Sequence, residues 1–328
     1  MDKLDKKTID VSRGLTYTYY TSPAKNGLPT VFLIHGWPDS AELWSDVTTN
    51  WLQPNGYGVV AIDCLGYGGT SKPTDREAYN FQYMAQDCKE ILDKEGLDKI
   101  VVLGHDWGSV LTARFWNFHP DRCAGVVFVN VAYMPPTDQP FDLDAVVQTT
   151  QQVFGYGLYW YWHFFASDEA PKVLNSRLES VWTIGHGLPE SWRNTFCTPN
   201  GMRDFLVADR RQPTLPYATE EMKQAFIARM QRDKFDGPQN WYGAMVHGVQ
   251  DEASKAVPKE NYAISAPVLF FAGSDDVVCR PEAIQMPVDN GLLPKLTSVV
   301  VKAGHWSMLS NPREFGEALT SWLKANFA

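Results

Sequence analysis

The chain has few of the features that would assign it to several common protein classes. Its five cysteines are odd in number, scattered and never spaced as C-x-x-C, which favours free thiols over a disulfide framework or a metal cluster. No run approaches the roughly 20 apolar residues of a membrane span. The opening MDKLDKKTID is charged, and no apolar segment follows it. We therefore expect no secretory signal and predict a cytoplasmic location.

Positive charge is also scarce. Lys and Arg total 29 against 38 Asp and Glu, a formal net charge of −9, and no Lys/Arg cluster stands out. A nucleic-acid partner is therefore not expected. The hydrophobic fraction of 44% and the charged fraction of 20% are those of a globular protein. At 328 residues the chain can bury a full core and carry one inserted subdomain.

Short apolar runs alternate with helical patterns on both sides of the middle of the chain. This alternation predicts a mostly parallel sheet flanked by helices. The segment TYTYYTS alternates with a period of two and is typical of an antiparallel edge strand. The predicted strands are 30–35, 58–63, 99–105, 124–131, 267–273 and 296–305, and the predicted helices are 41–52, 81–95, 109–119 and 313–327.

The middle of the chain breaks this alternation. It opens with MPPTDQP, is rich in aromatic residues, and contains helical patterns at 143–154, 171–184 and 219–232 without a convincing strand. An all-helical insertion before the last strands is best interpreted as a lid. We predict a core formed by residues 1–134 and 248–328 and a helical cap formed by residues 135–247.

The stretch GHDWG, residues 104–108, joins a predicted strand to a predicted helix. It has the G-x-S-x-G frame of a nucleophile elbow, but Asp106 stands where the serine would be. Asp106 could also be a simple helix N-cap, since Asp is among the best caps. A serine hydrolase is disfavoured, because Ser109 lies beyond the elbow.

Two further candidates follow late strands, where reactive groups of parallel sheets gather. They are the pair Asp275 and Asp276, and His305. Each could be an ordinary turn residue. Their order after Asp106, nucleophile then acid then histidine, is that of a hydrolase catalytic triad.

The segments HGWP, DCLGYGGTSKP, GHDWGS, AGSDDVVCRP and AGHW together resemble an epoxide hydrolase of the α/β-hydrolase superfamily, similar to the hydrolase domain of soluble epoxide hydrolases. The resemblance covers nearly the whole chain. It implies the α/β-hydrolase fold with a helical cap, Asp106 as nucleophile and His305 as base. The family pattern selects Asp276 as the acid, with Asp275 as the alternative.

The same resemblance implies two cap tyrosines that donate to the epoxide oxygen. An F-x-Y-x-x-Y pattern points to Tyr156, and N-W-Y points to Tyr242. Tyr159 and Tyr161 lie close to the first pattern and compete with it. Each tyrosine could equally be a packing residue.

A carboxylate is already ionised at neutral pH, so it can attack an sp³ carbon directly and open a strained ring. The expected product is a vicinal diol, released when His305, held by Asp276, activates water against the ester on Asp106. The backbone N–H groups of Trp37 and Trp107 are the expected oxyanion hole. The substrate would be a lipophilic epoxide, suggesting detoxification, and no cofactor or metal is called for.

Two alternatives remain open at this point. A haloalkane dehalogenase uses the same Asp–His–acid arrangement, but HGWP lacks an asparagine after HG and no arginine directly follows Asp106. A non-catalytic small-molecule-binding protein could keep the same pocket. The chain could be a monomer or a homodimer.

Overall fold

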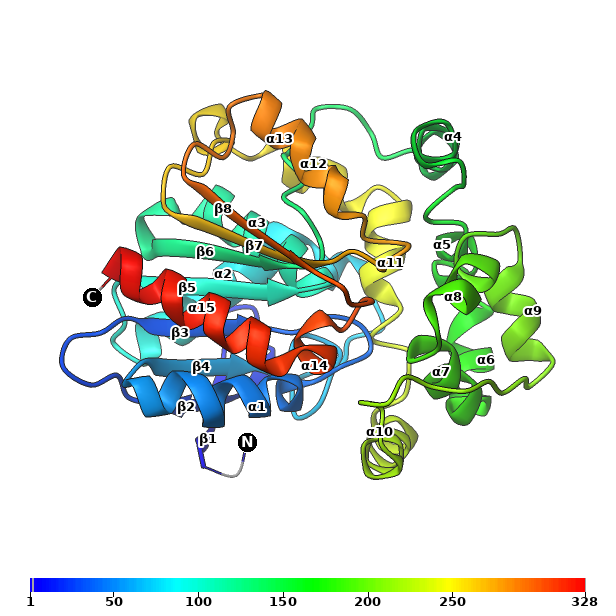
Figure 1. The fold of residues 1–328 in the computed structure, drawn as a ribbon, viewed down its shortest axis with the longest axis horizontal. Helices are drawn as coiled ribbons and strands as arrows, with labels where there is room; N and C mark the ends of the chain where they lie inside the picture. The colour runs from blue at the N-terminus through cyan, green and yellow to red at the C-terminus, as the bar shows by residue number, and fades with distance from the viewer. Residues whose placement is uncertain (2, 328) are drawn as a thin grey trace.

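The computed structural model describes residues 1 and 3–327, and its centre is one eight-stranded sheet (Figure 1). The strand order is β1-β2-β4-β3-β5-β6-β7-β8. β1 and β2 pair antiparallel with each other, β2 pairs antiparallel with β4, and all the other pairs are parallel. The strands are β1 Asp5–Asp10, β2 Thr16–Ser22, β3 Thr30–Ile34, β4 Gly58–Ile62, β5 Ile100–His105, β6 Cys123–Val129, β7 Val268–Gly273 and β8 Leu296–Val301.

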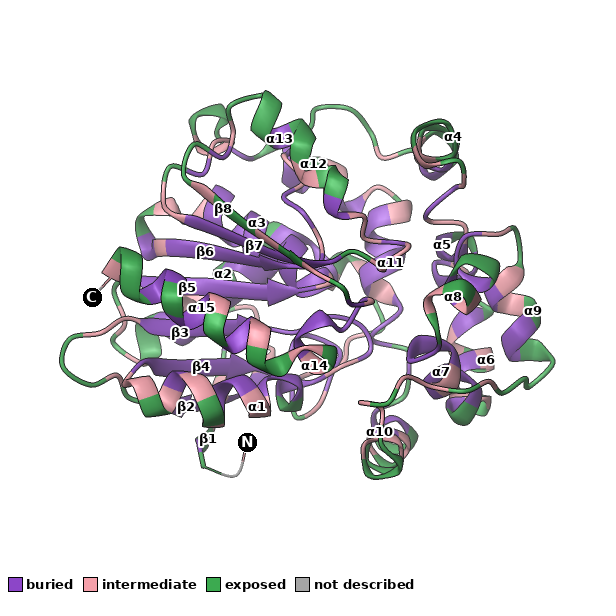
Figure 2. Ribbon diagram, in the orientation of Figure 1, coloured by how far each residue is buried: buried purple, intermediate pink, exposed green. Residues whose placement is uncertain are grey.

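β3, β4, β5 and β7 are buried along their whole length, as Figure 2 shows for the centre of the sheet. Runs such as TVFLI and GVVAI are apolar on both strand faces, because helices cover both faces of a parallel sheet. α2 and α3 contact each other on one face, and α1 and α15 contact each other on the other. The helices outside the central insertion are α1 Ser45–Val47, α2 Phe81–Lys94, α3 Trp107–Phe118, α13 Gln285–Asp289, α14 Ser307–Ser310 and α15 Pro312–Phe327.

Between β6 and β7 every residue is described, and the regular elements are helical apart from one isolated bridge between Gly187 and Thr214. In Figure 1, α4 to α10 lie to the right of the sheet, beyond the end of β5. The boundaries predicted for the cap, 135 and 247, stay a prediction. The helices of this segment are α4 Leu143–Phe154, α5 Tyr161–Phe165, α6 Ala170–Ser176, α7 Leu178–Gly185, α8 Pro189–Thr195, α9 Gly201–Val207, α10 Glu220–Asp233, α11 Asn240–Val246 and α12 Val249–Lys255.

Several local predictions differ from the structure. The predicted helix 41–52 is a succession of 3-10, α and π turns, and 171–184 is broken where Arg177 leaves the helical region between α6 and α7. β1 was not predicted, because its sequence DKKTID has only one aliphatic side chain. β1 is a mostly exposed edge strand, and such a strand needs no apolar face. The segment TYTYYTS, predicted as the edge strand, is β2 and is antiparallel as expected, but it lies inside the edge because β1 pairs with its outer side. Within residues 1 and 3–327, none of the helices has the length and apolar character that crossing a membrane requires.

Candidate active site

Asp106 follows β5 directly and precedes α3, on a turn that forces it into an unusual backbone conformation. Its φ of 54° and ψ of −126° lie in a region that residues other than glycine rarely adopt. The flanking glycines make the turn possible, because a Cβ on Gly104 would collide with the backbone of Gly108, and one on Gly108 with the backbone of Ile34. The G-x-D-x-G spacing therefore holds one carboxylate out from the end of the sheet.

His305 joins Asp106 to a second carboxylate. Its Nδ1 lies 2.7 Å from Oδ2 of Asp276, and its Nε2 lies 3.5 Å from Oδ2 of Asp106. The side chain of Asp276 is fully buried, whereas the carboxylate of Asp275 next to it accepts from the hydroxyl of Ser274. Of the two aspartates left open by the sequence, Asp276 is the one in contact with His305.

Asp276 is fixed by more than the histidine. The backbone N–H groups of Val278 and Cys279 donate to its Oδ1 at 3.0 and 2.9 Å, and Nδ2 of Asn130 donates to its Oδ2 at 2.9 Å. Sequence analysis missed Asn130. The available signal was an asparagine directly after the apolar run of β6, at the same sheet edge as Asp106.

Burial and charge act in opposite directions on this triad. Burial disfavours the imidazolium of His305, but the negative charge of Asp276 and the hydrogen bond to Asp106 outweigh it, so the pKa of His305 lies well above 6.5. For Asp276, burial would raise the pKa, but the imidazolium and the hydrogen bonds around the carboxylate hold it below its usual value. Both shifts favour an imidazolium beside a carboxylate in the resting pair.

This raised pKa gives stability a defined pH dependence. Protonation of His305 favours folding, so its contribution is complete below the unfolded pKa of about 6.5 and is lost as pH rises through the folded pKa. The free energy of unfolding, measured in urea, should differ most between wild type and His305→Gln near pH 6 and less at pH 9. A difference that grows with pH would contradict this assignment, and the same comparison in an Asp276→Asn background should depend little on pH.

The loop after β3 brings a backbone donor to the nucleophile. The N–H of Trp37 donates to Oδ1 of Asp106 at 2.8 Å, and a Cβ on Gly36 would overlap that carboxylate. The peptide bond between Trp37 and Pro38 is cis. Trp107 is the first residue of α3, so its N–H has no acceptor within the helix. Of the pair proposed for the oxyanion hole, Trp37 therefore contacts the Asp106 carboxylate directly, and Trp107 follows Asp106 in the chain.

Tyr159 and Tyr161 line a cavity together with Asp106, and Tyr242 packs against Trp107 beside it. Of these three tyrosines, only Tyr242 was assigned as a donor from the sequence. The ring of Tyr242, on α11, lies 5.1 Å from Trp107 and 5.9 Å from Tyr161, which begins α5. Burial and the charge of Asp106 raise the pKa of both phenols well above 10. Both hydroxyls therefore stay protonated at neutral pH.

The assignment of Tyr156 disagrees with the structure. Its hydroxyl donates to the backbone oxygen of Val277 at 3.0 Å, and Arg193 lies over its ring. Gly155 ends α4 in a left-handed conformation, and Tyr161, six residues further on, lines the cavity together with Asp106. The sequence offered Tyr156, Tyr159 and Tyr161 within six residues, and the F-x-Y-x-x-Y pattern selected Tyr156 over the other two.

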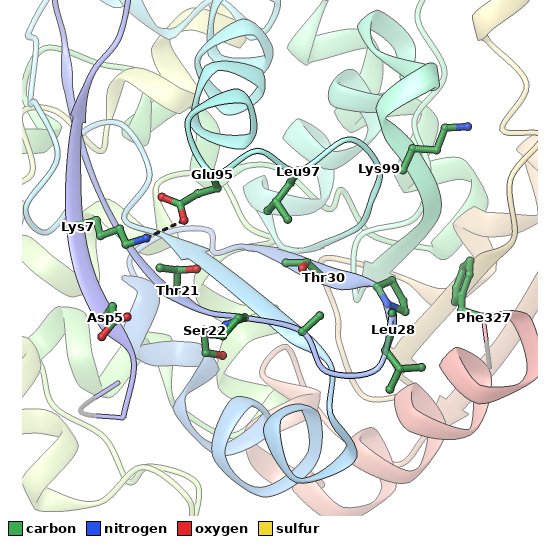
Figure 3. A pocket seen from close by; sticks show the side chains of 14 residues that line it. Asp5, Lys7, Thr21, Ser22, Leu28, Thr30, Glu95, Leu97, Lys99 and Phe327 are labelled. Atoms are coloured by element: carbon green, nitrogen blue, oxygen red, sulfur yellow. Dashed lines mark hydrogen bonds and ion pairs between the residues drawn. The ribbon is translucent and has the colours of Figure 1, made fainter.

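A cavity of about 460 Å³ opens onto Asp106. Its wall is mostly apolar and comes from α3, the segment after β6, and α5, with Tyr161 and Trp162 among the aromatic residues. A larger opening of about 700 Å³ lies at the opposite end of β3, where Lys7 pairs with Glu95 (Figure 3). None of the triad residues lines that second opening.

Within the part of the chain that the structure describes, one side-chain group could hold a metal ion. Ligand atoms of Asp276, Cys279 and His305 lie within 4.8 Å of one another. Nδ1 of His305 is already committed to Asp276, so a metal there would compete with the triad hydrogen bond. That the protein needs no metal or other cofactor stays a prediction.

The sheet, the elbow after β5 and the Asp–His–Asp arrangement define the class of protein: an α/β-hydrolase whose elbow carries an aspartate. The chain belongs to the alpha/beta hydrolase fold family, whose model matches residues 29–312. The structure is similar to that of epoxide hydrolase A from Mycobacterium thermoresistibile, with a TM-score of 0.79, 26% identity and 98% coverage of each chain.

Curated relatives carry related names. Bifunctional epoxide hydrolase 2 of Sus scrofa is 28% identical over 309 residues, which are 91% of this chain and 52% of that protein. The chain therefore spans about half the length of this mammalian relative. Epoxide hydrolase A of Mycobacterium tuberculosis is 29% identical over 307 residues, 90% of this chain and 91% of that protein.

Proposed function

We propose that this protein is an epoxide hydrolase that converts lipophilic epoxides to vicinal diols through an alkyl ester on Asp106. One observation carries the proposal: the carboxylate on the nucleophile elbow lines an apolar cavity together with Tyr161, and the ring of Tyr242 packs against both Tyr161 and Trp107 beside it. The names of the relatives support the same reaction.

In the first half-reaction, an oxygen of Asp106 attacks one ring carbon of the epoxide. The bond from carbon to the ring oxygen breaks, and the electron pair on that oxygen takes a proton from a phenol. Tyr161 and Tyr242 suit this role because the carboxylate and the burial keep their hydroxyls protonated. The second phenol donates a hydrogen bond and steadies the developing alkoxide.

In the second half-reaction, His305 first gives up its resting proton, which restores the phenol that donated to the ring oxygen. The neutral imidazole then removes a proton from water, whose oxygen attacks the ester carbonyl carbon of Asp106. The bond from that carbon to the diol oxygen breaks, the departing alkoxide takes the proton from His305, and the new Asp106 carboxyl returns its proton to the imidazole. Ester formation removes the negative charge that helps hold the imidazolium, so the pKa of His305 falls as the base is needed. Asp276 keeps the ring in place through Nδ1. The N–H groups of Trp37 and Trp107 would hold the tetrahedral oxyanion.

Turnover of styrene oxide tests this function against both alternatives. We expect many equivalents of diol per protein molecule, which a binding protein would not produce. A dehalogenase would release halide from a chloroalkane and leave the epoxide intact. Absence of diol together with chloride release would overturn the proposal.

The tyrosine assignment makes a separate prediction. Tyr161→Phe and Tyr242→Phe should each slow ring opening by about 10²-fold or more, because each removes a proton donor. Tyr156→Phe should change the rate by less than about twofold, since it removes one hydrogen bond outside the cavity. Single-turnover measurements of ester formation would check all three. A loss with Tyr156→Phe that exceeds the loss with Tyr161→Phe would restore the original assignment.

The wider context of this activity is part of the proposal. The five cysteines are unpaired, which suits the reducing cytoplasm proposed as the location. Detoxification and the choice between monomer and homodimer stay predictions.

A further inference from the structure

One face of α3 forms a side of the substrate cavity. Trp107, Val110 and Arg114 all line it. Their spacings of three and four residues place them one above another on a single helix face. This face begins beside Asp106. Arg114 therefore lies farther along the cavity wall, about two helical turns from the nucleophile.

Arg114 is a buried cation without a carboxylate partner. Only 5% of its surface is exposed, and no acidic group of the described residues lies within 4.0 Å of it. Asp251, the other charged residue of the wall besides Asp106, accepts from the N–H of Phe141 instead. A buried charge without a partner is costly, which is why most are paired.

Of the three guanidinium nitrogens of Arg114, only Nη1 donates hydrogen bonds to described residues. Nη1 donates to the backbone oxygen of Met134 at 2.9 Å and to Oδ1 of Asn117 at 3.1 Å. Asn117 is itself anchored, because its Nδ2 donates to the backbone oxygen of Asn261 at 2.9 Å. These contacts orient Arg114 and leave Nε and Nη2 without an acceptor among residues 1 and 3–327.

Nε and Nη2 of Arg114 are not completely buried in the core. The described residues include sealed and unpartnered side-chain nitrogens, such as Nε of Arg177, but neither Nε nor Nη2 of Arg114 is among them. Each of the two nitrogens therefore keeps some exposed surface, and Arg114 is one of the residues that line the cavity. Side by side, Nε and Nη2 form the edge that binds a planar carboxylate through two parallel hydrogen bonds.

We propose that Arg114 is an anion-binding residue of the substrate cavity and that the preferred substrates are epoxides bearing a carboxylate several carbons from the ring. This proposal rests on the function proposed above. Arg114 is eight positions beyond Asp106, which corresponds to about 12 Å along the helix axis. The arginine side chain leans back toward the helix N-terminus, which shortens this span. A two-carbon haloacid is too short to touch both residues.

The test compares the terminal epoxide of undecenoic acid with its methyl ester, and with the shorter pair made from pentenoic acid. The readout is the ratio of kcat/KM for acid to ester within each variant. In wild type we expect the longer acid to be preferred by about 10-fold or more, from a charge-assisted pair. The shorter pair should show little preference.

Arg114→Met should bring the ratio for the longer pair to 1 or below, because the protein's net charge of −9 disfavours an anion. Arg114→Lys should keep part of the preference, since it keeps the charge and loses the fork. The matched control is Arg203→Met, which removes an arginine paired with Glu169 on the cap surface and should keep the wild-type ratio. A wild-type ratio near 1, or a ratio unchanged in Arg114→Met, would overturn the proposal.

A binding measurement separates this proposal from the proposed function. Calorimetry with decanoate and with its methyl ester needs no turnover. Tighter binding of decanoate, lost by about 10-fold or more in Arg114→Met, would support the anion site even if no epoxide were hydrolysed. Equal binding of the two compounds to wild type would overturn it even if epoxides were hydrolysed.

Discussion

Replacement of Asp106 by alanine is expected to lower kcat for styrene oxide by about 10⁴-fold or more, because it removes the only group proposed to attack the ring. The other carboxylate near the site, Asp276, cannot replace it. Its side chain is fully buried, and its oxygens are occupied by His305, Asn130 and two backbone N–H groups.

The control for this experiment is binding. The cavity wall is otherwise intact in Asp106→Ala, so the diol product should still protect the protein against thermal unfolding. No covalent adduct should form on the protein. Retention of more than about a hundredth of wild-type turnover in a correctly folded variant would mean that water, rather than Asp106, attacks the epoxide.

The second large effect is expected from Asp276→Asn. The amide cannot hold a charge beside the imidazole, so the pKa of His305 should fall and its orientation through Nδ1 should be lost. By comparison with triads in which the acid is replaced by its amide, kcat should fall by about 10³- to 10⁴-fold. Ester formation needs no base, so it should slow much less.

The Asp276→Asn variant should therefore accumulate an alkyl ester on Asp106 that mass spectrometry detects in the intact protein. Asp275→Asn is the matched control, since it changes the neighbouring carboxylate, which accepts from the hydroxyl of Ser274. It should retain nearly full turnover and trap no ester. Trapping in Asp275→Asn and not in Asp276→Asn would exchange the roles of the two residues.

The sheet could be predicted from sequence because its strands are strongly patterned. The apolar runs at 58–63 and 99–105 coincide within one residue with β4 and β5, since a strand covered on both faces leaves few alternatives. β1 could not be predicted in this way, because it pairs at the edge with β2 through its backbone and buries little. Edge pairing of that kind has no side-chain signature.

The core part of the site followed from sequence for a related reason. Asp106, Asp276 and His305 each come directly after a strand or within a few residues of one, and parallel strands bring such positions to one edge. Tyr161 did not follow, because its place depends on where α4 ends and how the chain turns at Gly155. Arg114 did not follow either, since an arginine inside a helix is ordinary until its face is known to line a cavity.

The most direct test of the covalent route is a single turnover of styrene oxide in ¹⁸O-labelled water. Mass spectrometry would then follow both the diol and the peptide that contains Asp106. The account predicts unlabelled diol in the first turnover and one labelled oxygen left on the Asp106 carboxylate, because the new diol oxygen comes from the enzyme. Label in the first-turnover diol, with none on Asp106, would contradict it.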